Sequence, residues 1–281
     1  MQWKQFFTPV QSMDAKTAAR YMEEHPAETY TLLDVRQPKE YENSHIAGAK
    51  LIPVGELDRR LDELDTDKPA IVYCAIGGRS RIAAQMLSGK GFREVYNLSG
   101  GIRAWEHKTA MGPEDLGLHL FSGTEKTEET LAVAYGLEQG LRDFYLTMAA
   151  KVRSEEAKQL FTKLADIEIL HQNRIMDLHE QVTGIRRTKE EFAGNVVKQA
   201  MEGGLTTEQY LALYRPNLDS VPEIVSLAMS IEVQALDLYQ RAAQRTADHD
   251  SRLLLLQIAQ EERAHIEQLG RLLDATQAAE K

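Results

Sequence analysis

The strongest constraint on this chain is an internal repeat of acidic, imidazole and phenol side chains between Leu131 and Leu273. In each copy a lone glutamate precedes a tyrosine by seven residues, and a Glu-x-x-His motif follows. The copies are offset by 94 residues, and their members are Glu138, Tyr145, Glu168 and His171, then Glu232, Tyr239, Glu262 and His265. A fixed period of this kind indicates a duplicated structural unit.

The spacing of these residues predicts two antiparallel helical hairpins. Residues three apart, such as Glu168 and His171, project from one face of a helix. Glu138 and Glu168 lie symmetrically about residue 153, where Arg153-Ser154 indicates a helix break and a cap. Ala247-Asp248 has the same place in the second copy. Each hairpin therefore brings a lone glutamate level with a Glu-x-x-His motif.

Packing the two hairpins together gathers four carboxylates and two imidazoles at one level of a bundle core. This donor set is typical of a carboxylate-bridged centre that holds two iron or two manganese ions. The predicted ligands are Glu138, Glu168, His171, Glu232, Glu262 and His265.

Four long helices supply these positions, at approximately 127–152, 155–182, 221–245 and 250–275. Gly184 ends the second helix, and Ser220 with Glu223 forms a capping box for the third. The crossover between the hairpins is expected to contain short helices around 190–201 and 206–213.

Charge is distributed unevenly along the chain. Residues 1–108 carry 15 basic and 15 acidic side chains, whereas residues 109–281 carry 18 and 28. An acidic second part disfavours nucleic acid as a partner.

No apolar run is long enough to span a bilayer, and the N-terminus lacks the pattern of a signal peptide. The single cysteine, Cys74, excludes an intramolecular disulfide and Cys-x-x-Cys metal sites. We expect a cytoplasmic protein without a membrane partner.

Residues 1–107 alternate short apolar strands with helical segments. The expected strands are Phe6–Pro9, Tyr30–Asp34, Lys50–Pro53, Ala70–Cys74 and Glu94–Leu98, and the helices Ser12–Met22, Leu57–Leu64 and Ile82–Leu87. Such alternation predicts an α/β domain with a mostly parallel sheet and helices on both faces. The chain is thus divided into a domain at 1–108, a linker at 109–126 and a bundle at 127–281, with Leu116, Leu118, Leu120 and Phe121 of the linker docked on a neighbour.

Cys74 ends the most apolar of these strands, at the edge where open parallel sheets carry their chemistry. The residues that follow it are Ala75, Ile76, Gly77, Gly78, Arg79 and Ser80, and then a helix. The two glycines let backbone N–H groups point inward as an anion-binding nest beside the positive end of that helix. A thiol held there is stabilised as a thiolate. The alternative is a buried and inert cysteine.

Several motifs make residues 1–107 similar to a single-domain rhodanese. They are Asp34-Val35-Arg36 with Glu40-Tyr41, His45-Ile46-Ala47-Gly48-Ala49, the Cys74–Ser80 loop and Gly100-Gly101-Ile102-Arg103-Ala104-Trp105. The resemblance implies that Cys74 accepts a sulfane sulfur as a persulfide and passes it to an acceptor, and that Arg79 closes the cradle. Cysteine phosphatases and arsenate reductases also pair a cysteine with an arginine, but their loops have five intervening residues against four here. The shorter loop favours a single sulfur atom, and its uncharged centre leaves a persulfide open as the donor beside thiosulfate.

The second half, across roughly 125–276, resembles the rubrerythrin branch of the ferritin-like family through the six predicted ligands. The resemblance implies two iron ions, with manganese or zinc as substitutes, and Tyr145 and Tyr239 as hydrogen-bonding partners of the ligands. We expect the chain to form a homo-oligomer, a dimer. Because no rubredoxin-type cysteine site exists, electrons must come from an external donor protein.

We therefore expect a sulfurtransferase fused to a di-iron bundle that reacts with peroxide or oxygen. Two other functions stay open at this point. In one, the first half is a sulfur sensor or carrier for a di-iron oxidoreductase. In the other, the chain is a non-enzymatic metal-binding scaffold.

Overall fold

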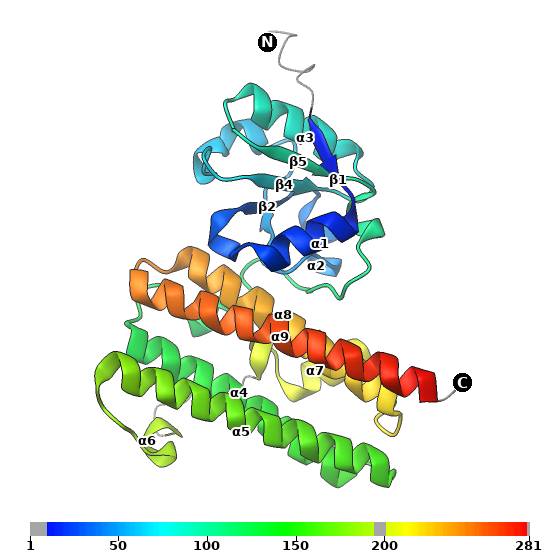
Figure 1. Cartoon of the computed structure of the whole chain (residues 1–281), viewed down its shortest axis with the longest axis vertical. Coiled ribbons are helices and arrows are strands. Elements are labelled where there is room, and N and C mark those ends of the chain that lie inside the picture. Colours follow the sequence, from blue (N-terminus) through cyan, green and yellow to red (C-terminus); the bar gives the residue numbers. More distant parts are fainter. Residues whose placement is uncertain (1–9, 194–200, 280–281) are drawn as a thin grey trace. The chain divides into compact units, whose positions relative to one another are not determined.

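The computed structural model describes residues 10–193 and 201–279. The chain forms two compact units, Met1–Glu114 and Asp115–Lys281 (Figure 1). Each unit has its own core.

The first unit is built on a five-stranded parallel sheet with the strand order β1-β5-β4-β2-β3. The strands are β1 (Gln11–Met13), β2 (Thr31–Asp34), β3 (Lys50–Leu51), β4 (Ala70–Tyr73) and β5 (Val95–Leu98). The predicted parallel sheet is confirmed, and β4, which leads directly into Cys74, occupies its centre.

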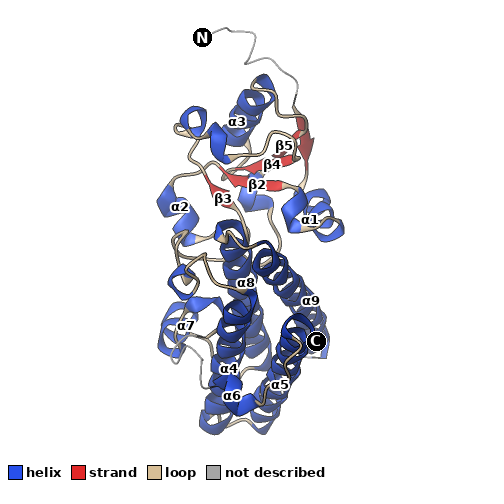
Figure 2. Cartoon of the chain, turned by 90° about the vertical axis from the view of Figure 1, so that its left-hand side faces the viewer, coloured by secondary structure: helices blue, strands red, loops and turns tan. Residues whose placement is uncertain are grey.

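Helices cover both faces of this sheet (Figure 2). They are α1 (Ala15–Glu24), α2 (Pro38–Asn43) and α3 (Gly78–Gly89). Successive side chains of a strand point to opposite faces. Leu33 and Val72 accordingly join one core cluster with residues of α3, whereas Leu32 and Ile71 join a second cluster with residues of α1 and α2. Burial on both sides explains why the strands are apolar throughout.

Two local predictions in this unit are wrong, and a third is not tested. The strand predicted at Phe6–Pro9 lies outside the described residues, and the edge strand β1 begins at Gln11. Ser12 was wrongly predicted as a helix cap, since it lies within β1. Asp14 caps α1 instead, where its Oδ1 accepts the N–H of Thr17 at 2.7 Å. The helix predicted across 57–64 is two separate 3₁₀ segments, Leu57–Arg59 and Leu61–Glu63.

The second unit is a bundle of two helical hairpins, which confirms the predicted four-helix architecture (Figure 1). The long helices are α4 (Thr127–Lys151), α5 (Glu155–Thr183), α8 (Val221–Arg245) and α9 (His249–Ala279). Ser154 caps α5 by accepting the N–H of Ala157, and Gly184 ends it in the left-handed conformation, both as predicted. The capping box at Ser220 was wrong, because Glu223 instead accepts the N–H of Asn217 at 2.6 Å.

The crossover between the hairpins contributes to the core. It contains α6 (Lys189–Ala193), a 3₁₀ turn at Glu202–Gly204 and α7 (Thr207–Tyr214). The helix predicted around 190–201 is described only as far as residue 193, and the one predicted at 206–213 is confirmed by α7. Tyr210 of α7 is fully buried in the bundle core. The 3₁₀ turn of the crossover packs against α8, which is buried on most of its surface.

Residues 109–126, predicted as a linker, divide between the two units. Ala110 pairs with His45 in a short antiparallel bridge, and Glu114 accepts the N–H of Leu51. Leu116 packs against the bundle core, and the ring of Phe121 lies edge-on to Tyr239 with centroids 6.4 Å apart. The apolar half of this segment thus belongs to the packing of the second unit.

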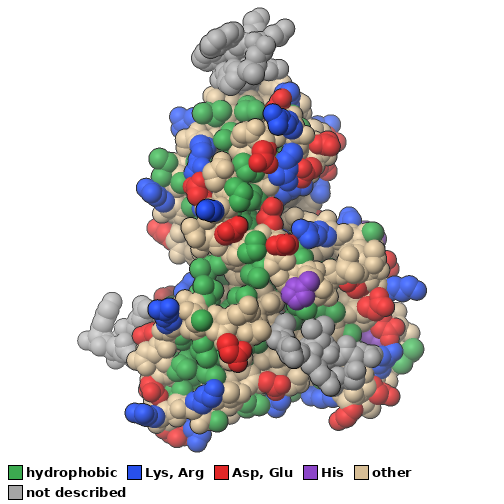
Figure 3. All heavy atoms as spheres, turned by 180° about the vertical axis from the view of Figure 1, so that it is seen from behind, with side chains coloured by type: hydrophobic (Ala, Val, Ile, Leu, Met, Phe, Trp, Pro, Cys, Tyr) green, Lys and Arg blue, Asp and Glu red, His purple; other side chains and the backbone are tan. Residues whose placement is uncertain are grey.

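Among the described residues, no helix has the length and apolar character needed to cross a membrane. On the face drawn in Figure 3, basic and acidic side chains are interspersed on each unit.

Candidate functional sites

The thiol of Cys74 lies at the carboxyl end of β4, directly before the first turn of α3. The residue is 1% exposed. Its Sγ accepts the N–H of Gly77 at 3.2 Å and lies 3.4 Å from the Ser80 hydroxyl. Ser80 Oγ also donates to the Asn97 side-chain oxygen of β5 at 2.7 Å. The hydroxyl has one hydrogen to share between these two acceptors.

The surroundings of Cys74 favour the thiolate. Burial raises the pKa of the thiol, but hydrogen bonds from the Ser80 hydroxyl and from the backbone N–H groups of Ser80, Ile76 and Gly77 outweigh it and lower the pKa below its ordinary value. This net lowering is the pattern expected of a reactive rather than a structural cysteine.

The loop after Cys74 is shaped by backbone contacts. Gly77 has a φ of 95°, and Gly78 is already the first residue of α3, so only one of the two glycines makes the predicted turn. The Cys74 and Ala75 carbonyl groups accept the N–H groups of Ile102 and Arg103. Gly101 passes so close that a Cβ there would lie 2.2 Å from the Cys74 carbonyl oxygen. The Ile76 side chain points away from this packing and is 63% exposed.

Arg79 was predicted to close the cradle, and its guanidinium forms an ion pair with Glu40 of α2. Arg79 Nη1 donates to Glu40 Oε2 at 2.7 Å, and Nη2 donates to Oε1 at 2.6 Å. This two-pronged pairing lowers the pKa of Glu40 to about 2, with Arg79 as the largest cause. Glu40 and the Cys74 thiolate both raise the pKa of Arg79.

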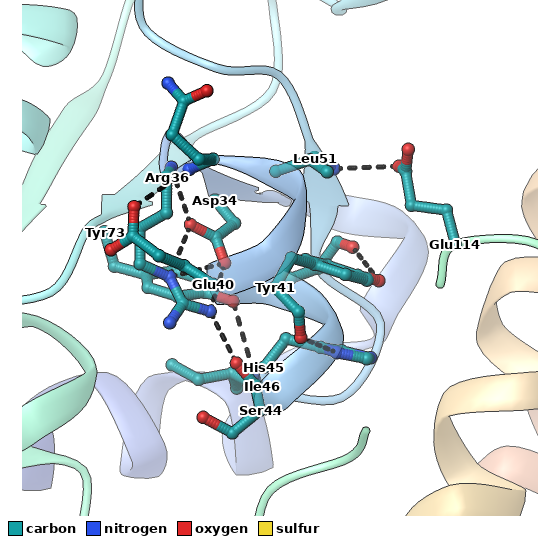
Figure 4. Close-up of polar contacts among 12 residues, drawn as sticks. Asp34, Arg36, Glu40, Tyr41, Ser44, His45, Ile46, Leu51, Tyr73 and Glu114 are labelled. Carbon is teal, nitrogen blue, oxygen red and sulfur yellow. Dashed lines mark hydrogen bonds and ion pairs between the residues drawn. The ribbon is translucent and has the colours of Figure 1, made fainter. Parts of the chain in front are cut away.

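A second ion pair, between Asp34 and Arg36, holds the end of β2 close to Glu40 (Figure 4). Arg36 donates to both carboxylate oxygens of Asp34 and to the carbonyl of Ser44, and both charged groups are buried. The N–H of Ile46 donates to the buried Tyr73 hydroxyl in the same cluster. These contacts fix the segment that carries Glu40.

In the second unit, the six predicted metal ligands form two clusters. Glu138, Glu168 and His171 come from the α4–α5 hairpin, and their donor atoms lie within 4.8 Å of one another. His171 Nδ1 is 2.8 Å from Glu168 Oε2 and 3.3 Å from Glu138 Oε2.

The second cluster repeats this arrangement on the α8–α9 hairpin. Glu232, Glu262 and His265 again have donor atoms within 4.8 Å of one another. His265 Nδ1 lies 3.2 Å from Glu262 Oε2 and 3.7 Å from Glu232 Oε2. The imidazole rings of His171 and His265 stack with centroids 3.9 Å apart, so the two clusters meet in the middle of the bundle.

Burying several carboxylates close together shifts the pKa values of groups in this site. Burial is the largest cause that raises the pKa of Glu168 well above its ordinary value, and repulsion from Glu138 and Glu232 adds to it. Burial lowers the pKa of His171, but the carboxylates of Glu138 and Glu168 outweigh it and raise the pKa to about 12. Glu168 and His171 therefore hold their protons to a higher pH than isolated side chains do. Burial also raises the pKa of Glu232, but hydrogen bonds with Glu262 and His265 outweigh it and lower that pKa.

This donor set fits two divalent cations. The four carboxyl groups are between 1% and 3% exposed, a situation that is costly for charged groups without a counter-charge. Two divalent ions would balance four carboxylate charges, and the oxygen and imidazole donors are those that iron and manganese accept.

Tyr145 and Tyr239 are both buried in the bundle interior. Tyr145 packs against Phe144 and Phe161, and Tyr239 packs against Phe121. Their predicted role as hydrogen-bonding partners of the ligands stays a prediction.

Two residues near Cys74 were given no role from the sequence. Glu40, 39 residues from Arg79, was named only as part of a rhodanese motif, and Asn97, 17 residues from Ser80, was not named. Glu40 also lies three residues after Gln37, where it closes the capping box of α2.

Comparisons with known proteins agree with the two-part organisation. Residues 14–108 match the family model of the rhodanese-like domain, and residues 129–273 match that of rubrerythrin. An uncharacterized protein of Bacillus subtilis, YqhL, is 48% identical over 77 residues, which are 27% of this chain and 61% of that protein. The putative sulfur carrier protein YrkF of the same organism is 40% identical over 82 residues, 29% of this chain and 44% of that protein.

The thiosulfate sulfurtransferase GlpE of Coxiella burnetii is 40% identical over 75 residues, 27% of this chain and 70% of that protein. The chain thus spans less than two thirds of the length of the first two relatives. A solved rhodanese-like domain protein from Staphylococcus aureus is 25% identical, with a TM-score of 0.33, over 36% of this chain and 98% of that structure.

Proposed function

Because the chain belongs to the rubrerythrin family and carries a rhodanese-like domain ahead of its bundle, we propose that it combines two activities, sulfur transfer at Cys74 and reaction at a di-iron centre. The first activity is transfer of sulfane sulfur through a persulfide on Cys74. The second is reaction of the iron-loaded bundle with peroxide or oxygen.

Sulfur transfer proceeds in two balanced displacements. The Cys74 thiolate attacks the outer sulfur of a donor R–S–S⁻, the donor S–S bond breaks, and R–S⁻ leaves with the bonding electron pair. The new persulfide anion, Cys74–S–S⁻, is stabilised by the N–H groups of the loop and by the N-terminus of α3. An acceptor thiolate then attacks the outer sulfur and releases the Cys74 thiolate.

The observation that carries this proposal is the thiol with a lowered pKa inside a cradle of backbone donors. A thiolate is both the better nucleophile and the better leaving group in exchange at sulfur. The relative named as a sulfurtransferase supports the same chemistry.

Mass spectrometry of the intact protein after exposure to a sulfane donor tests the assignment. We expect one added sulfur atom in the parent and none in Cys74→Ser. Arg79→Ala should lower transfer strongly while leaving the fold intact, because the Glu40 carboxylate would face the thiolate without its counter-charge. Transfer activity retained by Cys74→Ser would contradict the proposal.

In the bundle, Glu138, Glu168 and His171 would hold one iron ion, and Glu232, Glu262 and His265 the other. Two bound iron ions supply redox chemistry toward peroxide or dioxygen, which protein side chains alone do not provide. The chain contributes neutral imidazoles, carboxylates that balance the metal charge, and apolar surroundings that keep bulk water out. Tyr145 and Tyr239 would orient the carboxylates.

Metal content of the purified protein tests this second site. Glu168→Ala and Glu262→Ala should each reduce bound iron, whereas Glu180→Ala should not, because Glu180 is half-exposed on the same helix and pairs with Arg186. Iron near zero in protein made with ample iron would remove the di-iron centre from the proposal, and the chain would then be a sulfurtransferase alone.

A continuing reaction needs electrons from another protein, since Cys74 is the only cysteine of the sequence and no cysteine-ligated iron site can form. We place this activity in the cytoplasm, where thiol acceptors stay reduced. A homodimer is part of the proposal, and sedimentation of the iron-loaded chain tests it. Should wild-type protein bind a persulfide but fail to turn over, the sensor or carrier function replaces the transferase.

A further inference from the structure

The ion pair between Arg79 and Glu40 reduces the positive charge that the loop presents to a substrate. Both terminal nitrogens of Arg79 donate to Glu40, at 2.7 and 2.6 Å, in the parallel geometry that guanidinium groups use to bind oxyanions. The Arg79 guanidinium keeps other N–H groups, and it also interacts with the Cys74 sulfur, but the Glu40 carboxylate occupies the edge formed by its two terminal nitrogens and balances its positive charge. The charge that the sequence places beside Cys74 is already neutralised.

Glu40 is held so that it can keep this pairing. Its Oε2 also accepts the N–H of Gln37 at 3.1 Å, which fixes the side chain at the start of α2. Arg36 lies near Glu40 but is committed to the buried carboxylate of Asp34 (Figure 4). With a pKa of about 2, Glu40 stays ionised throughout the pH range in which the thiolate exists.

We propose that Glu40 is a specificity-determining residue that withholds the Arg79 charge from dianionic donors and so selects sulfane donors of low charge. This inference rests on the sulfur transfer proposed above. The preferred class is the persulfide of a thiol, and the disfavoured class is thiosulfate. The apolar loop residues Ala75 and Ile76, the latter largely exposed, suit a donor of the first class.

The two classes of donor differ in the charge of their leaving group. With a persulfide, the Cys74 thiolate takes the outer sulfur and one thiolate, R–S⁻, departs. With thiosulfate, the same attack breaks the S–S bond and releases sulfite, which carries two negative charges past the Glu40 carboxylate. A free Arg79 would bind the sulfonate oxygens of thiosulfate and of departing sulfite, as planar guanidinium groups do.

Glu40→Gln is the variant that isolates this effect. Glutamine keeps the length of the side chain and can still accept the Gln37 N–H, but it carries no charge. The probes are thiosulfate and methanethiosulfonate. A methyl group in methanethiosulfonate replaces one negatively charged oxygen of thiosulfate, so the two donors differ by one negative charge. Dithiothreitol serves as the common acceptor, and released sulfide is measured. We expect the ratio of kcat/KM for thiosulfate to that for methanethiosulfonate to rise about tenfold, equivalent to one charge-assisted hydrogen bond.

Two further variants make the test specific. Glu40→Gln combined with Arg79→Gln should lose the gain, because the freed guanidinium is its cause. Glu63→Gln is the matched control. Glu63 also has its pKa lowered to about 2 by a two-pronged pairing with Arg60, but the partners of its carboxylate are Arg60 and Lys50, which lie outside the loop of Cys74. The donor ratio should not change in that variant.

The outcomes separate this inference from the proposal beneath it. Absence of transfer from every donor in the parent protein would overturn sulfur transfer itself. A parent that transfers sulfur, with a ratio that is unchanged or lower in a folded Glu40→Gln variant, would overturn only the role of Glu40. If Glu40→Gln does not fold, Glu40→Asp, which is too short to keep both contacts, should raise the ratio in the same direction. An unchanged ratio in Glu40→Asp contradicts the inference equally.

Discussion

The imidazole rings of His171 and His265 lie face to face, with centroids 3.9 Å apart and planes 6° apart. They come from different hairpins, and each directs its Nδ1 toward the carboxylates of its own hairpin. The stacking therefore brings the two ligand clusters into direct contact at the centre of the bundle. His171, whose pKa the neighbouring carboxylates raise, must lose its proton before its ring can bind a metal ion.

Stability of the metal-free bundle should fall as pH rises from about 5 to about 9. Glu168 has a folded-state pKa well above its ordinary value, so the stability it contributes is present below the unfolded pKa and is lost as pH increases. His171, with a pKa of about 12, acts in the same direction. Urea unfolding followed by far-ultraviolet circular dichroism measures the slope.

Glu168→Gln should make this loss of stability with rising pH smaller, because a carboxyl group whose ionised form is opposed by burial and by repulsion from Glu138 and Glu232 is replaced by a neutral amide. Glu180→Gln, on the same helix but half-exposed, should leave the slope unchanged. A steeper slope in Glu168→Gln would mean that the carboxylates do not repel one another.

Binding of a divalent metal near neutral pH should release protons. Glu168 and His171 retain protons in the metal-free site, and both must lose them to become ligands. Release is measured with an indicator dye in weakly buffered solution as Fe²⁺ or Mn²⁺ is added without oxygen. Apparent affinity should accordingly weaken as the pH is lowered. Binding without proton release would show that the ligands were already deprotonated.

The thiolate of Cys74 should form below the ordinary thiol pKa. Cys74 is the only cysteine of the sequence, so absorbance at about 240 nm reports on it alone once Cys74→Ser is subtracted. Ser80→Ala removes the hydrogen bond that lowers the pKa most, and the titration should move to higher pH. Ser88→Ala, on the same helix, is the control. A midpoint that does not move would leave the backbone N–H groups as the dominant stabilising contacts.

Gly101→Ala should damage the first unit far more than Gly91→Ala. Both glycines have positive φ, which costs a residue with a Cβ about 1–2 kcal/mol. A Cβ at Gly91 meets nothing within 4 Å, whereas one at Gly101 would lie 2.2 Å from the Cys74 carbonyl oxygen. Gly101→Ala should therefore cost about 1–3 kcal/mol more. Both tryptophans of the sequence, Trp3 and Trp105, lie in this unit, so fluorescence during denaturation follows it selectively. Equal losses for the two variants would contradict the close approach.

The bundle could be predicted from the sequence because its metal-ligand positions and its helix breaks recur at a fixed spacing. A helix break at Arg153-Ser154 and another at Ala247-Asp248 set the lengths of two hairpins, and the 94-residue offset aligned them. The spacing of Glu168 and His171 then placed both side chains on one face. No long-range contact had to be known to bring the two clusters together.

The details that escaped prediction depend on distant partners. Ser12 looks like a helix cap until β5 is present to pair with it in the sheet. Glu40 and Arg79 are 39 residues apart and meet only when β2 and β4, the strands that precede α2 and α3, lie side by side in the sheet. Ion pairs of this kind have no periodicity. The pattern of the sequence therefore identified the nucleophile, Cys74, but not the carboxylate that pairs with Arg79 beside it.

The solitary cysteine determines how long a captured sulfur atom can be stored. In many thiol enzymes a second thiol of the same chain can attack a persulfide, expel sulfide and close a disulfide. Cys74 has no such neighbour in this sequence, and it is almost completely shielded from solvent. A persulfide formed there would decay only when an external thiol enters the cradle. The lifetime of the loaded protein would therefore be inversely proportional to acceptor concentration, and each chain would deliver a single sulfur atom per visit, in ping-pong order.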